Sequence, residues 1–93
     1  MNQATLVGHL GNDPEVSEFD GGRVARFRLA TNRRWKGKEH TDWHSVKVFG
    51  PLVGVVEQYV KKGGRLLVVG RIEYRESDGK YFTDIIAQDI ELL

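Results

Sequence analysis

The sequence predicts an all-β fold that contains a single α-helix. Apolar residues alternate with polar ones along most of the chain, which is the two-residue period of strands. Turn-forming residues separate these stretches, as at Asn12-Asp13-Pro14, Asp20-Gly21-Gly22 and Ser77-Asp78-Gly79-Lys80. A chain of 93 residues without a linker or repeat fits one domain over 1–93.

Five strands are predicted from this alternation, over residues 3–10, 23–32, 42–49, 65–75 and 81–92, with a short extension of the first over 15–19. In the second strand, Phe27 and Leu29 share one face while Arg26 and Arg28 share the other. The segment 33–41 is polar and contains glycine, so we expect a loop there.

One helix is predicted between the third and fourth strands. It begins at Gly50-Pro51, because proline is tolerated in the first turn. Lys61 and Lys62 are expected in its last turn, with Gly63-Gly64 as the C-terminal cap. One apolar stripe should face the core, formed by Leu52, Val55, Val56, Tyr59 and Val60. This order of elements is that of an OB-fold, a partly open five-stranded Greek-key barrel whose face and loops bind oligonucleotides or oligosaccharides.

The composition excludes several classes of protein. The chain has no cysteine, so disulfides and thiolate metal sites are excluded. No apolar stretch approaches the roughly 20 residues of a membrane span, and we expect no membrane partner. No secretory signal is apparent, and we expect a cytoplasmic protein. His40 and His44 should not converge on a metal, and no triad or carboxylate pair has a suitable setting, so we expect no enzyme, metal or cofactor.

Positive charge is concentrated in one part of the chain. The formal net charge is only +1, but residues 21–38 hold seven of the 14 lysines and arginines and no acidic residue. A local excess of one sign is typical of a surface that binds a polyanion. The alternative is a solvated basic face with no partner.

Aromatic side chains accompany this charge. In the third strand, Trp43, Lys47 and Phe49 alternate onto one face, opposite the apolar Val46 and Val48. Unpaired bases stack on aromatic rings with a gain of about 1–3 kcal/mol per base, and phosphates need a cationic track. The predicted stacking residues are Trp35, Trp43, Phe49 and Tyr74. The predicted phosphate contacts are Arg33, Arg34, Lys36, Lys38, Lys47, Lys62, Arg71 and Arg75.

Each candidate also has a structural alternative. Trp43 could pack at a subunit contact, Phe49 could belong to the core, and Trp35 could be an exposed aromatic without a ligand. The cations outside the basic stretch are more often solvated surface charges.

The sequence resembles the bacterial and mitochondrial single-stranded DNA-binding proteins. The matching motifs cover essentially the whole chain: LVGHLGNDPE (6–15), FRLATN (27–32), TDWHSVKVF (41–49), YVKKG (59–63) and VGRI (69–72). The resemblance implies an OB-fold that forms a homotetramer and wraps single-stranded DNA. It implies that Trp35, Trp43 and Phe49 stack on bases, and that Tyr74 or Tyr81 replaces a further aromatic expected near Ser77.

The resemblance has three further implications. Lys62 matches a cation near the end of the helix, and His44 matches a histidine associated with tetramer contacts. Bacterial members carry an acidic C-terminal tail that recruits replication and repair proteins. The chain stops at Leu93 without such a recruiting tail, so we expect either a trimmed piece of a longer protein or a tail-less member, and replication and repair proteins remain open as partners.

The leading functional hypothesis is sequence-independent binding and protection of single-stranded DNA in replication, recombination and repair, at the nucleoid. The alternative is an OB-fold adaptor of a replication or primosome complex that acts through protein–protein contacts. RNA binding is a third hypothesis, because a groove built on stacking does not inherently recognise the 2′-hydroxyl. Leu67 and Val69, on the outer side of the fourth strand, predict contacts between copies of the chain.

Overall fold

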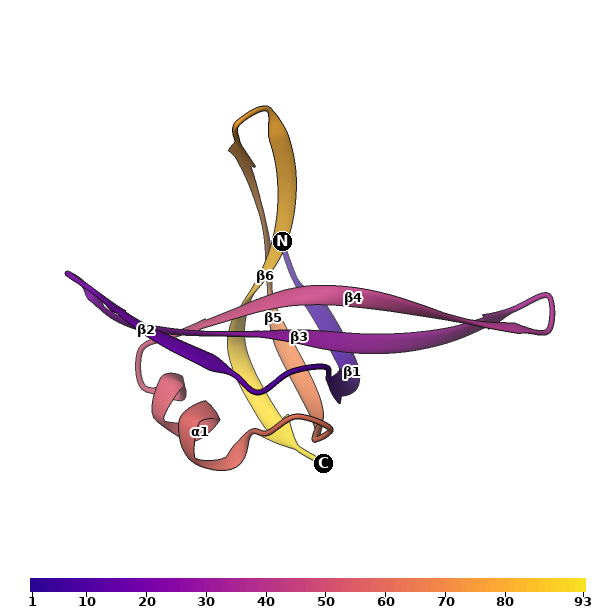
Figure 1. Ribbon diagram of the computed structural model, residues 1–93, viewed down its shortest axis with the longest axis horizontal. Helices are drawn as coiled ribbons and strands as arrows, with labels where there is room; N and C mark the ends of the chain where they lie inside the picture. The colour runs from indigo at the N-terminus through magenta and orange to yellow at the C-terminus, as the bar shows by residue number, and fades with distance from the viewer.

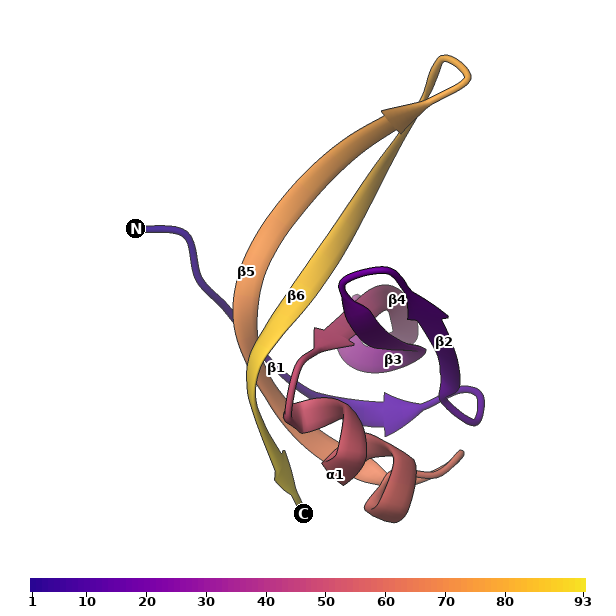
Figure 2. The same ribbon diagram turned by 90° about the vertical axis from the view of Figure 1, so that its left-hand side faces the viewer.

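The computed structural model describes residues 1–93 as a small β-barrel with one helix (Figures 1 and 2). Its elements are β1 (Ala4–Leu10), β2 (Glu15–Phe19), β3 (Gly22–Trp35), β4 (Lys38–Phe49), α1 (Leu52–Tyr59), β5 (Arg65–Ser77) and β6 (Lys80–Leu92). The predicted extension of the first strand is therefore a separate strand, β2. The helix is short, and no helix of the chain could cross a membrane.

The barrel closes through five of the six strands. The sheet order is β1-β5-β6-β4-β3-β2, and β1 also pairs with β3, so β2 is the one strand outside the ring. The pairing of β4 with β6 is parallel, whereas the others are antiparallel. A Cβ on Gly8 would overlap the carbonyl oxygen of Ala30, so glycine lets β1 approach β3 closely where the ring closes. These features confirm the OB-fold prediction.

The core lies inside the barrel, on the faces that the alternation predicted. Phe27 and Leu29 of β3 are buried, as are Val46 and Val48 of β4 and Val68 of β5. Since side chains of a strand alternate between faces, the intervening residues of β3 and β4 point outward. Helix α1 covers one end of the barrel (Figure 2).

Two hairpins continue beyond the barrel as arms (Figure 1). In the β3–β4 arm, residues 31–42, the two strands pair only with each other. The same is true of the β5–β6 arm, residues 74–83. The arms extend in different directions from the barrel, so they present surfaces that the core does not cover.

The prediction of a loop over 33–41 was wrong. Strand β3 runs to Trp35 and β4 starts at Lys38, joined by the two-residue turn Lys36-Gly37. Both turn residues have positive φ, 51° and 75°, as a tight hairpin turn requires. The arm has solvent on both faces, so its strands carry no apolar alternation, and polarity was mistaken for irregular structure.

The predicted helix stripe was wrong at both ends. It left out Val53, which is buried together with Val56, and it included Tyr59, which is 58% exposed. The chain leaves the helix at Val60 with extended backbone, which turns Val60 into the core and leaves Tyr59 outside. Lys61 and Lys62 consequently follow the helix instead of lying in its last turn. Gly63 does not cap it either, since its N–H donates to the carbonyl of Leu10 on β1 at 2.9 Å.

Candidate nucleic-acid interface

The outward residues of β3 and β4 form one surface, which we call the basic face. Cross-strand register places Arg28 opposite Ser45 and Arg26 opposite Lys47. Directly paired residues lie on the same side of a sheet, so the arginines share a face with the outward residues of β4. The basic face consists of Arg26, Arg28, Trp43, Ser45, Lys47 and Phe49.

Trp43 has a defined seat on this face. Its side chain is 50% exposed, and the Arg28 guanidinium lies 4.8 Å from the ring centroid. A Cβ on Gly11 would overlap the six-membered ring, so the missing side chain at Gly11 makes room for the indole. The ring is thus held from two sides while half of its surface faces solvent, which is what a stacking residue requires.

Phe49 lies at the far end of the same face. It is 42% exposed, so it is not an ordinary core residue. Its ring meets that of Phe19 edge to face, with centroids 6.1 Å apart and planes at 83°. Phe19, at the end of β2, was not among the predicted residues, because its strand was treated only as an extension of the first.

Trp35 lies on the other side of the ribbon from Trp43. It pairs with Lys38 at the tip of the β3–β4 arm, whereas Trp43 pairs with Ala30. Trp35 and Ala30 are five residues apart on β3, an odd number, so alternation puts the two indoles on opposite faces, roughly 17 Å apart along the ribbon. Trp35 is 59% exposed, and the Lys36 ammonium lies 4.7 Å from its ring centroid.

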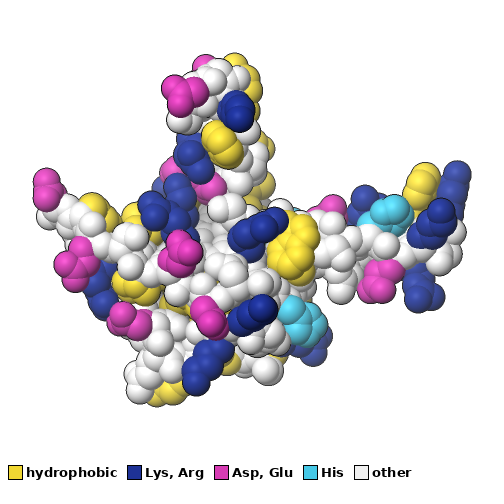
Figure 3. Space-filling view, in the orientation of Figure 1, with side chains coloured by type: hydrophobic (Ala, Val, Ile, Leu, Met, Phe, Trp, Pro, Cys, Tyr) yellow, Lys and Arg dark blue, Asp and Glu magenta, His cyan; other side chains and the backbone are white.

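The remaining predicted residues of this arm are exposed cations. Arg33 forms an ion pair with Asp42, with Nε 3.2 Å from Oδ2. Arg34, Lys36 and Lys38 form no ion pair. Figure 3 shows Lys and Arg side chains gathered along this arm. The arm therefore carries a positive charge that its own acids do not neutralise.

A buried carboxylate links the barrel part of β4 to the β5–β6 arm. Asp84 of β6 is 1% exposed, and its Oδ2 lies 2.7 Å from Nε of Arg75 and 3.2 Å from Nζ of Lys47. Burial raises the pKa of Asp84, but the hydrogen bonds from Arg75 and Lys47 outweigh it. The charge of Lys47 and a hydrogen bond with Ser45 add to this effect. The net result is a pKa below the ordinary aspartate value, so Asp84 is ionised at neutral pH.

This carboxylate changes what two of the predicted cations can do. Lys47 is only 16% exposed, because it is folded onto Asp84. Arg75 keeps more exposure, and its guanidinium carbon lies 4.4 Å from the ring centroid of Phe82. Both are oriented groups that already have a counter-charge, so their positions are fixed before any ligand arrives.

The other predicted residues lie elsewhere. Arg71 pairs with Glu73 at 3.0 Å, and Lys62 is exposed in the segment after α1. Tyr74 is highly exposed on the β5–β6 arm, but it alternates with Arg75 and so lies on the opposite side of that ribbon. The structure therefore groups Trp43, Phe49 and Lys47, and it leaves Tyr74 outside that group.

The model of the single-strand binding protein family matches residues 1–93. The chain belongs to this family.

Two curated relatives are similar over most of the chain. The single-stranded DNA-binding protein 1 of Chlorobaculum tepidum is 37% identical over 105 aligned residues, covering 100% of the chain and 65% of the relative. The single-stranded DNA-binding protein of Rhizobium meliloti is 37% identical over 101 residues, covering 95% of the chain and 58% of the relative. The chain thus spans about three-fifths of the length of these family members.

A solved structure agrees with the fold as well. It is described as the Plasmodium falciparum SSB complex with ssDNA, with a TM-score of 0.91 and 33% sequence identity. The match covers 100% of the chain and 95% of that structure's chain.

In this member of the single-strand binding protein family, sequence reasoning missed two features of the interface besides Phe19. Arg26 and Arg28 were assigned to a polar face but not to the site. They line a shallow hollow of about 210 Å³ on the basic face with Asn12, Glu15, Phe27 and Ser45. Asp84 was also missed, although an acidic residue directly before the buried Ile85, Ile86 and Ala87 is a signal of a paired carboxylate.

Proposed function

We propose that the chain binds single-stranded DNA without regard to its sequence. The observation that carries the proposal is the half-exposed indole of Trp43, seated between Gly11 and Arg28, with Phe49 exposed on the same face. Any base can stack on an aromatic plane, and the arginines beside the rings donate hydrogen bonds to phosphate oxygens, so neither contact selects a sequence. The names of the relatives and the description of the solved structure support the same activity.

The geometry supports one path for the strand. Bases stack on Trp43 and Phe49 while the phosphates follow Arg26 and Arg28. A strand that also reaches Trp35 has to follow the twist of the β3–β4 arm, because that indole lies on the other face of the ribbon. Flexible single strands follow such a path readily, whereas bending a duplex costs about 1–6 kcal/mol. The arm therefore favours single-stranded over double-stranded DNA.

The proposal includes an assembly and a cellular role. Val7 is exposed and is paired with the half-buried Leu67 on the outer side of β1 and β5, beside Val69. An apolar strip of this kind suits contacts between copies, and we expect a homotetramer. The role is to coat and protect transient single strands at the nucleoid in replication, recombination and repair, where replication and repair proteins are further partners. The proposal assigns no catalytic step to any residue.

Intrinsic tryptophan fluorescence tests the proposal. Titration with oligo(dT) at low salt should quench the emission, because bases stack on the indoles. The variants Trp35→Phe and Trp43→Phe assign the signal to one indole each. Unchanged emission in the wild-type protein, together with no retardation of labelled oligo(dT), would remove the proposal.

Two controls separate the alternatives. Oligo(U) in the same titration distinguishes DNA from RNA, since stacking alone serves both. Light scattering at micromolar concentration measures assembly, and a particle of four 10.6 kDa chains is expected. A monomer under these conditions would contradict the tetramer without affecting the DNA-binding proposal.

A further inference from the structure

Strand β2 has a free edge. It pairs with β3 on one side, and no strand pairs with its other side. None of the backbone hydrogen bonds outside the regular elements involves residues 15–19. Alternate N–H and C=O groups of β2 therefore point away from the protein without a backbone partner. Such an edge is a template for another extended segment.

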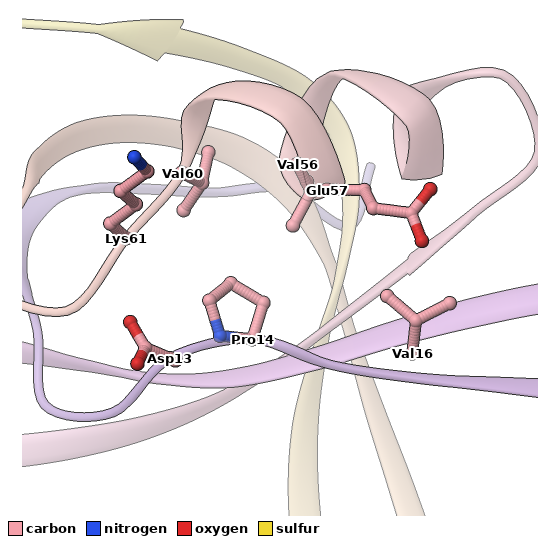
Figure 4. A pocket seen from close by; sticks show the side chains of 7 residues that line it. All are labelled: Asp13, Pro14, Val16, Val56, Glu57, Val60 and Lys61. Atoms are coloured by element: carbon pink, nitrogen blue, oxygen red, sulfur yellow. The ribbon is translucent and has the colours of Figure 1, made fainter.

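A cleft lies directly beside this edge. It has a volume of about 450 Å³ and separates β2 from α1 (Figure 4). Pro14 and Val16 form its floor, while Val56 and Val60 of the helix face them. Val16 is paired with the buried Ala25, so its side chain points toward the core and the cleft opens onto apolar surface.

The geometry of the cleft suits an added strand. A segment that pairs with β2 would place every second side chain on the side of Val16, toward the helix. The volume lies within the range of about 300–1,000 Å³ that is common for ligand sites. Aliphatic side chains fit the apolar lining.

Charge decides which segment fits. Residues 12–22 carry four acidic residues and no lysine or arginine: Asp13, Glu15, Glu18 and Asp20. Glu15, Glu18 and Asp20 form no ion pair. Glu57, at the other end of the cleft, is paired with Arg23 at 3.0 Å, and Lys61 is the one cation that lines the cleft. The edge therefore repels a phosphate backbone, and it also repels the acidic β2 of a second copy.

We propose that the β2 edge binds an extended peptide of alternating aliphatic and basic side chains from another protein. The peptide adds one strand to β2, its aliphatic side chains enter the cleft against Val16 and Val56, and its basic side chains, on the opposite side of the added strand, face Glu15. Glu18, on the cleft side, adds to the negative charge of the edge. Main-chain hydrogen bonds hold the segment, and the cleft and the charges select it. The cleft lies on the other side of β2 from the basic face, and Glu15 is the one residue that the proposed peptide site shares with the hollow beside Arg26 and Arg28.

A synthetic probe tests this site. The probe is a capped, fluorescein-labelled heptapeptide of alternating valine and lysine, and it is titrated into the protein by anisotropy and by NMR. We expect amide shifts in Glu15–Phe19 and in the helix near Val56, with no shift at the indoles of Trp35 and Trp43. Shifts centred on the basic face, or no binding at millimolar peptide, would overturn the proposal.

Two comparisons separate strand addition from simple charge attraction. N-methylation of the peptide amides on one edge should abolish binding, while methylation on the other edge leaves it intact. The variant Glu15→Lys/Glu18→Lys should weaken binding about tenfold. The control Glu76→Lys/Glu91→Lys makes the same change of charge at exposed positions away from β2 and should leave the affinity unchanged. Equal losses in both variants, or equal effects of both methylated peptides, would contradict strand addition.

Discussion

The two ends of strand β3 show opposite surfaces built on one strand. At its start, β3 pairs with the acidic β2, and at its end it pairs with β4 to form the basic arm. Both ends expose an aromatic ring, Phe19 at 50% and Trp35 at 59%. Exposed aromatic residues alone therefore do not identify a DNA contact in this molecule, because the charge around the ring decides which ligand can approach it.

The boundary between these surfaces is also visible. Phe19 of the acidic end touches Phe49 of the basic face. A strand of DNA that stacks on Phe49 reaches the acidic hairpin at this point and is turned away from it. The candidate site therefore has a direction as well as a composition. It runs along the basic face from Phe49 past Trp43 toward the β3–β4 arm.

The largest expected effect concerns Asp84, the buried carboxylate on the basic side. Asp84→Asn should lower the free energy of unfolding by about 1–3 kcal/mol, because Lys47 and Arg75 lose their charged acceptor. The exposed pair offers a matched control: Asp42→Asn, which removes the partner of Arg33, should cost less than about 1 kcal/mol. Urea unfolding at pH 7 measures both values, and equal losses would contradict the distinct role of Asp84.

The same residue predicts a pH dependence. Its folded-state pKa is lowered, so its stabilising contribution is complete above the unfolded value of about 3.9 and is lost as the pH falls through the folded value. The wild-type protein should lose stability on acidification below about pH 4, and Asp84→Asn should show a shallower loss. Parallel profiles for the two proteins would contradict the lowered pKa.

The stacking residue gives the next effect. Trp43→Ala should weaken oligo(dT) binding by about 1–3 kcal/mol, since one base loses the aromatic ring on which it stacks. Tyr59→Ala is the control, because Tyr59 is comparably exposed but lies on α1, away from the basic face. Fluorescence anisotropy of labelled oligo(dT) measures both. A loss of affinity for Tyr59→Ala as large as that for Trp43→Ala would contradict the assignment of DNA binding to the basic face.

Salt dependence separates the two ends of β3. Arg26→Gln/Arg28→Gln should reduce the slope of log K against log salt by about 0.7 for each phosphate contact removed. Arg23→Gln, at the acidic end, should leave the slope unchanged, because Arg23 is paired with Glu57. Affinities between low and moderate salt give the slopes. An equal change in both variants would mean that the charge of the whole protein, and not the basic face, attracts DNA.

The smallest effect tests the seat of Trp43. Gly11→Ala introduces a Cβ that overlaps the indole, so the half-exposed ring should move while the fold is kept. The affinity loss should be about 1 kcal/mol, less than for Trp43→Ala, because the ring remains available. Gly54→Ala is the control, since a Cβ there meets nothing within 4 Å. An unchanged tryptophan emission spectrum in Gly11→Ala would contradict the close packing of the Trp43 indole against Gly11.

Much of the barrel was predictable because its strands have one solvent-exposed face and one buried face. Phe27 and Leu29 are buried and Arg28 is exposed, as alternation required. The β3–β4 arm was not predictable in this way, since both of its faces are exposed to solvent. The turn Lys36-Gly37 was a usable signal, because a two-residue hairpin turn fixes the register of the strands on either side.

The candidate site also combines residues that alternation could predict with residues that it could not. Trp43, Lys47 and Phe49 share a face because they belong to one strand with unbroken alternation. The position of Trp35 on the other side of the ribbon required the full length of β3, which the predicted loop concealed. The partners of Asp84 could not be identified from the sequence, because they come from β4 and β5. Contacts between distant strands depend on register, which local patterns do not contain.

NMR mapping with unlabelled oligo(dT) tests the central claim most directly. The account predicts shifts of both tryptophan indole N–H signals and of the β3 and β4 residues of the basic face, while α1 stays unchanged. Shifts concentrated on β2 and α1, or indole signals that do not move when the DNA binds, would contradict it.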